Sequence, residues 1–327
     1  MNQLFLPALK GFGAAGVALA LAVPVTALAQ GYPDRPVKVI VGFAPGGSSD
    51  TVARLVGQKL APLLGQPVVV ENKPGAGGVL GADLVAKAPG DGYSLLLAVS
   101  GHATAAAMMK KLPFEPVKDF AWITMLTTYP FVFATSPQAP FKSLPELIAR
   151  AKAQAGKLTY SSVGVGSAHH LVGEWFNAET GANLLHVPFR GGAATLVEVI
   201  AGRVDIMVET ATLALPHIQG GKLRALAVTS RHPVEVLPGV PTVNQIVPGF
   251  EYQSWLGVAA PAATPAAVVE RLNREIRRVL DQPDVRQRLA ELGGGAAPTS
   301  PETMRAEVES QIARWQRLVE SRGIEKQ

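Results

Sequence analysis

An apolar stretch that begins at Val39 ends in a glycine pair, Gly46 and Gly47, and continues with two serines and an aspartate at positions 48–50. Glycine lets the backbone turn sharply and approach a ligand closely, while Ser and Asp favour the start of a helix. The first turn of a helix has free N–H groups and the positive end of the helix dipole. The pattern therefore predicts a turn that binds a carboxylate or a phosphate, although a loop that needs glycine only for its shape gives the same pattern.

The same order of residues recurs in the second half of the chain. A predicted strand, Leu158–Ser161, leads into Gly164, Gly166 and Ser167, and a predicted helix, His169–Glu179, follows. Two such helix starts on opposite sides of a cleft would hold an anion with two acidic ends, one end at each helix. The pair of turns therefore indicates a hinged clamp for a small acid.

Other reactive side chains near these turns do not match a catalytic or metal site. Ser167 directly follows Gly166 and is followed two residues later by His169, so the stretch fits neither the nucleophile turn of hydrolases nor the dinucleotide-binding fingerprint. His169 and His170 are adjacent and would point to different faces of a helix, whereas metal ligands on a helix are commonly four residues apart. The chain has no cysteine. We expect no metal, no cofactor and no enzymatic activity.

The elements that position these residues alternate between apolar strands and amphipathic helices. Strands are predicted at Val37–Phe43, Val68–Glu71 and Ser94–Val99, with a helix at Asp50–Leu64 after the first of them. This order is typical of a parallel sheet covered on both faces, whose ligands bind beyond the C-terminal strand ends. A second cycle follows, with strands at Pro130–Thr135, Leu158–Ser161, Leu184–Pro188, Val204–Val208 and Leu223–Val228. The chain then returns through a strand at Trp255–Ala259 and helices at Pro265–Leu280, Pro283–Glu291 and Pro301–Arg322.

The N-terminal segment has the features of a secretory signal peptide. Lys10 is its only charge, an apolar run extends from Gly11 to Val23, and Ala27 and Ala29 form a small-residue cleavage site. A retained membrane anchor is the alternative, but the run is short and has no stop-transfer charges behind it. We expect residues 1–29 to be removed and the mature chain to be soluble outside the cytoplasm.

Composition excludes some classes of partner. The chain has 327 residues and a formal net charge of +5, and its Lys and Arg residues are spread along the sequence. A nucleic-acid-binding protein typically has a basic stripe interleaved with aromatic residues, and none is visible here. We therefore expect no nucleic-acid partner.

Nine stretches in a fixed order make the chain similar to a known family. They are YPDRPVKVIVGFAPGGSSD, VVVENKPGAGG, GDGYSLLL, YSSVGVGSAHHLVGE, HVPFRGG, GRVDIMVET, GKLRALAVTS, WLGVAAPAATP and RWQRLVESRGI. With these stretches the whole mature chain resembles the periplasmic solute-binding proteins of tripartite tricarboxylate transporters, the Bug or TctC family.

The resemblance implies an α/β periplasmic binding protein of type II-like architecture. Each of its two lobes would be a mixed, mostly parallel sheet flanked by helices, with the ligand buried between the lobes. The implied boundaries are 1–29 for the signal peptide, 30–128 with 252–327 for lobe 1, and 129–251 for lobe 2. The implied ligand-binding residues are Phe43, Ala44, Gly46, Gly47, Ser48, Asp50, Ser100, Ser161, Gly164, Gly166, Ser167, His170 and Glu209.

Three positions carry open alternatives. Arg190 stands where the family commonly has Lys, and it either clamps a carboxylate or lies at the surface, which we favour. Asp50 either faces the ligand or stabilises the start of its helix. His170 either lines the cleft or packs beside it. The stretch Arg231–Pro241 is slightly shorter than the family's usual loop.

The resemblance also implies a function and a partner. The family captures small carboxylates, such as di- and tricarboxylates or aromatic acids, and delivers them to membrane permease subunits. We expect this chain to act as a periplasmic, monomeric receptor of that kind, with a dicarboxylate as the preferred ligand. The alternative is a sensory protein that presents the same bound acid to a membrane sensor kinase.

Overall fold

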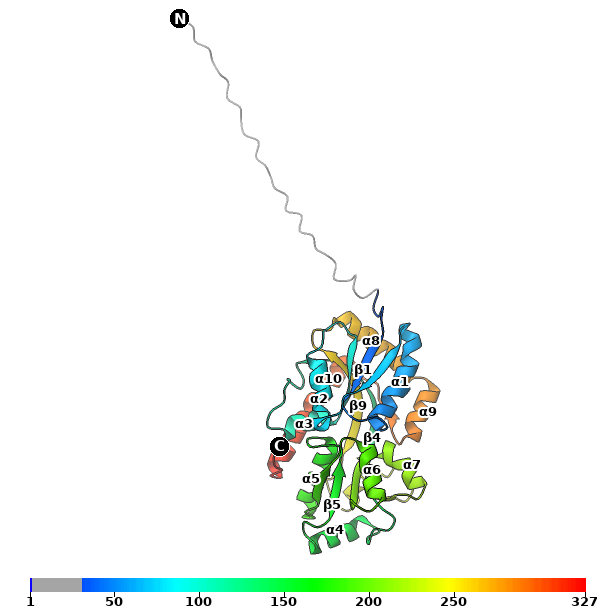
Figure 1. The fold of residues 1–327 in the computed structure, drawn as a ribbon, viewed down its shortest axis with the longest axis vertical. Helices are drawn as coiled ribbons and strands as arrows, with labels where there is room; N and C mark the ends of the chain where they lie inside the picture. Colours follow the sequence, from blue (N-terminus) through cyan, green and yellow to red (C-terminus); the bar gives the residue numbers. More distant parts are fainter. Residues whose placement is uncertain (2–30) are drawn as a thin grey trace. The chain divides into compact units, whose positions relative to one another are not determined.

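The computed structural model describes Met1 and residues 31–327, so the expected signal peptide lies outside the described residues apart from Met1. Within the described residues, no helix combines the length and the apolar character needed to cross a bilayer. Residues Pro33–Gln327 form one compact unit, and the following description concerns this unit (Figure 1).

The first half of the unit is built on three parallel strands in the order β2-β1-β3. Their bounds are Val37–Val41 for β1, Val68–Asn72 for β2 and Ser94–Val99 for β3. The apolar residues of β1 and β3 are mostly buried, whereas Lys38 of β1 is exposed. This burial fits a sheet covered by helices on both faces. The helices here are α1 (Ser48–Leu64), α2 (Val79–Ala86) after the short 3₁₀ turn η2 (Ala76–Gly78), and α3 (Gly101–Met108).

The second half has its own parallel strands, in the order β6-β5-β7. They are β5 (Thr159–Ser162), β6 (Leu185–Pro188) and β7 (Ile206–Thr210), and β8 (Arg224–Val228) pairs antiparallel with β4. The helices of this half are α4 (Leu144–Ala153), α5 (Ala168–Thr180), α6 (Gly192–Ile200) and α7 (Ala211–Gln219), and the 3₁₀ turn η3 (Val243–Gln245) precedes the return of the chain.

Two long strands, β4 (Phe120–Thr135) and β9 (Gln253–Pro261), join the halves. The first part of β4 pairs antiparallel with β9, from Phe120 opposite Pro261 to Pro130 opposite Gln253. From Phe131 onward β4 pairs with β7 and β8 instead. The sheet is therefore mixed, and the sequence-based prediction of an α/β mixed sheet flanked by helices is confirmed. The expected lobe boundary at 128/129 falls inside the uninterrupted strand β4 and stays a prediction.

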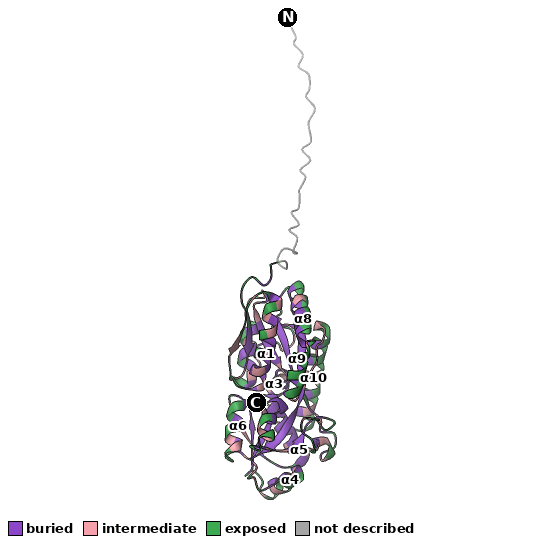
Figure 2. Ribbon diagram, turned by 90° about the vertical axis from the view of Figure 1, so that its right-hand side faces the viewer, coloured by how far each residue is buried: buried purple, intermediate pink, exposed green. Residues whose placement is uncertain are grey.

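The C-terminal helices pack against the first half of the sheet. They are α8 (Ala266–Leu280), α9 (Pro283–Glu291) and α10 (Pro301–Ser321), and the two-residue strand β10 (Gly295–Ala296) pairs with β4. Met304 and Val308 of α10 share one core cluster with Ile40 and Leu96. A second cluster, which includes Val132, Met207 and Leu215, fills the other half. Figure 2 shows these buried strands beneath helices whose outer faces are exposed.

Three elements depart most from the sequence-based prediction. The strand β4 begins at Phe120, ten residues before the predicted strand at Pro130. The helices α3 and α7 were not predicted at all. Nearly every residue of α3 is buried, so it has no amphipathic pattern, and α7 contains Pro216, which normally signals the end of a helix. Both helices begin at the site described next.

Candidate ligand-binding cavity

Five helices begin around one cavity between the two halves of the sheet. Its space, including the part open to solvent, is about 460 Å³. Each helix starts directly after a strand or a glycine turn, so the free N–H groups of its first turn point toward the strand ends. The lining residues at these helix starts are Gly47, Ser48 and Ser49 of α1, Ser100 and Gly101 of α3, Ser167, Ala168 and His169 of α5, Gly192 of α6 and Thr210 of α7.

Three of the five helices lack a side-chain cap. Gly47, Ser100 and Gly191 precede α1, α3 and α6, and none of them has a side chain bonded to the first turn. The other two are capped, because Ser167 Oγ accepts from His170 N–H at 3.3 Å and Thr210 Oγ1 accepts from Leu213 N–H at 3.4 Å. The first-turn amides of α1, α3 and α6 are therefore the groups with most capacity left for an anion.

The turn before α1 is held in shape from the side away from the cavity. Gly46 has a φ of 83°, in the left-handed region that favours glycine, and its N–H donates to Asp50 Oδ2 at 3.1 Å. Asp50 also accepts from Arg54 Nε at 3.0 Å and from Asn72 Nδ2 at 3.1 Å. Burial raises the pKa of the Asp50 carboxyl, but these hydrogen bonds outweigh burial and leave the pKa below its ordinary value. Asp50 thus stabilises the turn at the start of its helix, which is the second of the two alternatives given for this residue.

The turn before α5 is held by its own side chains. Ser162 Oγ accepts from Gly164 N–H at 3.1 Å, and Ser167 Oγ donates to Gly164 O at 2.6 Å. Gly166 N–H donates to His170 Nδ1 at 3.2 Å. The turn also meets the first half of the unit, because Thr104 Oγ1 of α3 donates to Gly166 O at 3.0 Å. The two halves are therefore in contact beside the cavity.

His170 packs behind this turn and does not line the cavity. Its ring stacks on His186 with centroids 3.9 Å apart. Burial lowers the pKa of His170 to about 4, and burial together with the nearby His170 ring lowers the pKa of His186 to about 3. Both rings are therefore neutral at pH 7, as the acceptor role of His170 Nδ1 requires.

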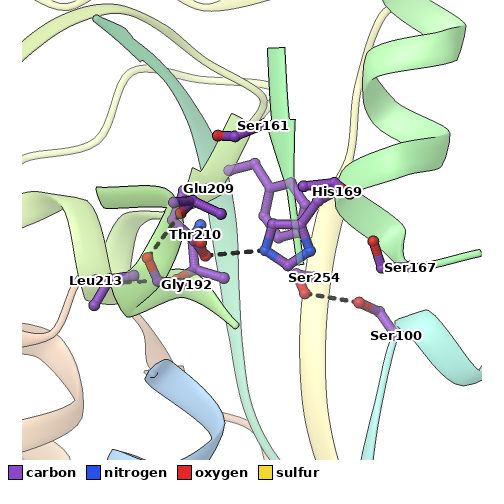
Figure 3. Close-up of polar contacts among 12 residues, drawn as sticks. Ser100, Ser161, Ser167, His169, Gly192, Glu209, Thr210, Leu213 and Ser254 are labelled. Carbon is purple, nitrogen blue, oxygen red and sulfur yellow. Dashed lines mark hydrogen bonds and ion pairs between the residues drawn. The ribbon is translucent and has the colours of Figure 1, made fainter. Parts of the chain in front are cut away.

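Buried hydroxyl groups form one wall of the cavity, as Figure 3 shows for Ser100 and Ser254. The Oγ atoms of these serines lie 2.7 Å apart, and the Tyr252 hydroxyl donates to Ser100 Oγ at 2.8 Å. Tyr129 of β4 lies at the same wall. Burial raises the pKa of Tyr129, its hydrogen bonds with Ser254 and Ser48 lower it, and the nearby Tyr252 and Glu209 raise it further. This wall offers neutral donors and acceptors.

The opposite wall carries a carboxylate. Glu209, at the end of β7, is 2% exposed and accepts at Oε1 from Thr210 N–H at 2.8 Å. His169 Nε2 lies 2.9 Å from the same oxygen (Figure 3). Among the residues that line the cavity, all from the described part of the chain, there is no Lys or Arg. Arg190 is exposed, as the favoured surface alternative expects.

The structure brings six of the thirteen predicted site residues to the cavity. They are Phe43, Gly47, Ser48, Ser100, Ser167 and Glu209. The other seven are not part of the lining: Ala44, Gly46, Asp50, Ser161, Gly164, Gly166 and His170. Ten lining residues were not among the predicted site residues: Ser49, Val99, Gly101, Tyr129, Val163, Ala168, His169, Gly192, Thr210 and Ser254. Several of them could have been found from their neighbours in the sequence, since Ser49, Gly101 and Thr210 each directly follow a predicted site residue.

The arrangement suits binding better than catalysis. Within residues 31–327 and Met1, no group of three His, Cys, Asp or Glu side chains could hold a metal. Ser167 Oγ, the serine at the start of α5, donates to a backbone carbonyl, so its proton is not directed to a histidine. The cavity offers an anion several backbone amides and hydroxyl groups, with the carboxylate of Glu209 at one side.

Comparison with known proteins identifies the relatives of the chain. The model of the tripartite tricarboxylate transporter family receptor, TctC, matches residues 52–324. Protein BugT of Bordetella pertussis (strain Tohama I) is 36% identical over 306 residues, which is 93% of each chain. The structure of the periplasmic binding protein BugD is 37% identical, with a TM-score of 0.87 over 90% of this chain and 100% of that one. MatC from Rhodopseudomonas palustris, solved with bound malate, is 36% identical, with a TM-score of 0.85 over 88% and 100%.

Proposed function

The chain belongs to the tripartite tricarboxylate transporter receptor family, Bug or TctC, and from this membership we propose that it captures a small carboxylate in the cavity and delivers it to membrane permease subunits. The classes of acid that we expect are di- and tricarboxylates and aromatic acids. Binding would take place in the periplasm, after removal of the signal peptide near Ala29, and the protein would act as a monomer without enzymatic activity.

One observation carries this proposal: five helix N-termini meet at a cavity that has no Lys or Arg in its lining. A carboxylate in such a place is held by backbone amides and helix dipoles, which need no charged partner. The amides of α1, α3 and α6 are the strongest candidates because their N-caps form no side-chain bond. The malate bound to MatC supports a carboxylate as the class of ligand.

Closure of the two halves would signal that the acid is bound. A ligand favours the closed form when it contacts both halves, and here the lining comes from α1 and α3 on one side and from α5, α6 and α7 on the other. Presentation of the closed form to a membrane sensor kinase is the second candidate function. Uptake of the acid by a deletion strain distinguishes the two, because loss of uptake supports the transport role.

A thermal-shift screen of the mature protein against small carboxylates tests the receptor function. A ligand that binds only the folded state raises the Tm by mass action. We expect at least one acid to raise the Tm in proportion to the logarithm of its concentration. Mass spectrometry of denatured protein identifies any acid that co-purifies. A flat screen from protein shown to be free of ligand would contradict the proposal.

A further inference from the structure

A second pocket lies where the C-terminal helix α10 meets α5. Its space, including the part open to solvent, is about 520 Å³, and it is lined by Trp175 of α5 and by Arg314, Trp315, Arg317, Leu318 and Ser321 of α10. This α5–α10 pocket shares no lining residue with the ligand cavity. Because α5 belongs to the second half of the unit and α10 packs against the first, the pocket has one wall from each half (Figure 1).

The α5–α10 pocket contains a buried donor that the protein does not use. Trp315 is 2% exposed, and its Nε1 is buried without a hydrogen-bond partner among the described residues. The other tryptophan of the pocket differs, since Trp175 Nε1 donates to Glu179 Oε1 at 2.9 Å. A buried indole N–H normally has an acceptor, because leaving it unpaired costs free energy. Trp315 Nε1 therefore indicates an acceptor that comes from outside the chain.

Two arginines flank this donor. Arg314 is exposed, and its guanidinium carbon lies 4.7 Å from the centre of the Trp315 ring. Arg314 Nη2 donates to Glu251 O at 3.1 Å, which helps to hold the side chain over the ring. Arg317 is also exposed and forms no ion pair with any described residue. Two guanidinium groups beside an N–H donor favour a carboxylate, which arginine binds with paired hydrogen bonds.

The carboxylate already present beside the α5–α10 pocket is used by other groups. Glu179 Oε1 accepts from Trp175 Nε1 and forms an ion pair with Arg322 Nη2 at 2.9 Å. This ion pair joins α5 to the residue that follows α10. It leaves Arg317 and Trp315 Nε1 without an acid of their own, so the α5–α10 pocket keeps a positive charge that the chain does not neutralise.

Both walls of the α5–α10 pocket connect to the ligand cavity. Trp175 lies on α5, and His169 in the first turn of the same helix lines that cavity. On the other wall, the Trp315 ring lies 5.4 Å from the Tyr252 ring, and the Tyr252 hydroxyl donates to Ser100 Oγ in the lining of the cavity. The Trp175 and Trp315 rings are 6.1 Å apart. A rotation of one half against the other would change the spacing of the two walls.

The charge pattern of α10 favours a protein over a lipid surface as the occupant. The first half of α10 carries Glu302, Glu307 and Glu309, which are all exposed, and an anionic bilayer lying along the helix would meet them. One Asp or Glu side chain is small enough to reach a single recessed N–H between two guanidinium groups. Trp and Arg are also the residues that contribute most strongly to protein–protein interfaces.

Resting on the proposed function, we propose that the α5–α10 pocket is the docking point for the membrane permease, which inserts an Asp or Glu side chain between Arg314 and Arg317 to accept from Trp315 Nε1. Because the two walls come from different halves, the permease binds the closed, loaded receptor better than the open one. The pocket thus couples occupancy of the ligand cavity to delivery of the acid.

Uptake by a deletion strain that carries receptor variants tests this docking point. The substrate is a radiolabelled form of the acid that raises the Tm in the screen described above. Arg317→Glu should lower the rate of uptake about tenfold or more, because it places a like charge opposite the permease carboxylate. Titration calorimetry on the purified variant should give an affinity for the acid within about twofold of the wild type, since Arg317 lies outside the cavity lining.

Arg277→Glu is the matched control. Arg277 is exposed near the end of α8, as Arg317 is near the end of α10, and it too forms no ion pair within the described part of the chain. This variant should support uptake at the rate of the wild type. Trp315→Phe keeps an aromatic ring against Tyr252 and removes only the N–H donor, so uptake should fall while affinity for the acid stays unchanged.

Selection for restored uptake in the Arg317→Glu strain identifies the occupant. We expect uptake to return when one acidic residue in a periplasmic loop of the permease is replaced by Lys or Arg. If no such change restores uptake, the pocket does not bind a permease carboxylate and the inference is overturned.

The remaining outcomes separate this inference from the proposed function. Unchanged uptake by Arg317→Glu, or a loss of acid affinity equal to its loss of uptake, would overturn the docking point while the receptor function stands. Binding to phosphatidylglycerol vesicles, or a dimer in light scattering, that Arg317→Glu abolishes would assign the pocket to lipid or to a second copy and would also overturn it. If no acid binds the ligand-free wild type, the proposed function itself fails.

Discussion

The two glycine turns of the cavity look alike in sequence and are built differently. The turn before α1 leaves its helix uncapped and is supported from behind by Asp50. The turn before α5 is capped by Ser167 and supported by His170. The first turn of α1 has unused N–H donors for an anion, whereas one of the N–H donors in the first turn of α5 is already bonded to the Ser167 side chain. A glycine turn is therefore a binding site only when its helix start remains unsatisfied.

Gly47→Asp is expected to have the largest effect, because it would give α1 the cap it lacks. Gly47 has φ −84° and ψ 175°, which any residue adopts, and Asp is a favoured N-cap. The new carboxylate would occupy the amides meant for the ligand and repel it. We expect affinity for the bound acid to fall by about 100-fold or more, roughly 3 kcal/mol, in calorimetric titrations.

Gln282→Asp is the matched control for this change. Gln282 precedes α9, also without a side-chain cap and with extended backbone, and it is not part of the lining. Both variants should be as stable as the wild type or slightly more stable. Equal affinities in the two variants would show that the start of α1 does not hold the acid.

Lowering the pH should destabilise the turn before α5 sooner than the turn before α1. The pKa of His170 is about 4 in the folded protein and about 6.5 ordinarily, so the unfolded state takes up the proton first as the pH falls. The stability that depends on a neutral His170 is fully present above about pH 6.5 and is lost progressively down to about pH 4. From this ring alone we expect urea unfolding to give a free energy about 2 kcal/mol lower at pH 5 than at pH 7.

The variant His170→Asn should remove much of this pH dependence, while the exposed His232→Asn should retain it. His186 contributes in the same direction, since its pKa is lowered to about 3. An identical loss of stability in all three proteins between pH 7 and pH 5 would show that His170 is not responsible.

Ser167→Ala should have a smaller effect, confined to the capped turn. The change removes the acceptor for His170 N–H and the donor to Gly164 O. We expect a loss of about 1 kcal/mol in the free energy of unfolding, measured in urea without ligand. No loss of stability would mean that the second turn is as open as the first.

Arg190→Gln is expected to have the smallest effect. Arg190 is exposed and lies outside the lining, so stability should stay within about 0.5 kcal/mol and affinity for the acid within about twofold. A tenfold loss of affinity would instead identify Arg190 as a clamp on the carboxylate.

The sequence predicted the parts of the site that have a local signal. Glycine pairs and helix-start residues marked α1 and α5, and the family motifs marked Ser100 and Glu209. The starts of α3 and α7 gave no such signal, because α3 is buried on nearly all sides and Pro216 interrupts the pattern of α7. Tyr129 and Ser254 reach the cavity through the pairing of β4 with β9, a contact between distant segments that local patterns do not reveal.

His169 shows a different limit of predicting the site from the sequence. The sequence placed two adjacent histidines at the start of α5 and favoured His170 near the cleft. The rotation of about 100° between neighbouring helix residues sends His169 to Glu209 and His170 to the back of the turn. Which of the two faces the cavity depends on how α5 packs.

A crystal structure of the mature protein with its bound acid tests the central claim most directly. The account predicts a carboxylate whose oxygens lie about 2.7–3.2 Å from backbone N–H groups in the first turn of α1, at Ser48 or Ser49, with further contacts at the start of α3 or α6. An acid held by Arg or Lys side chains, or bound outside this cavity, would contradict it.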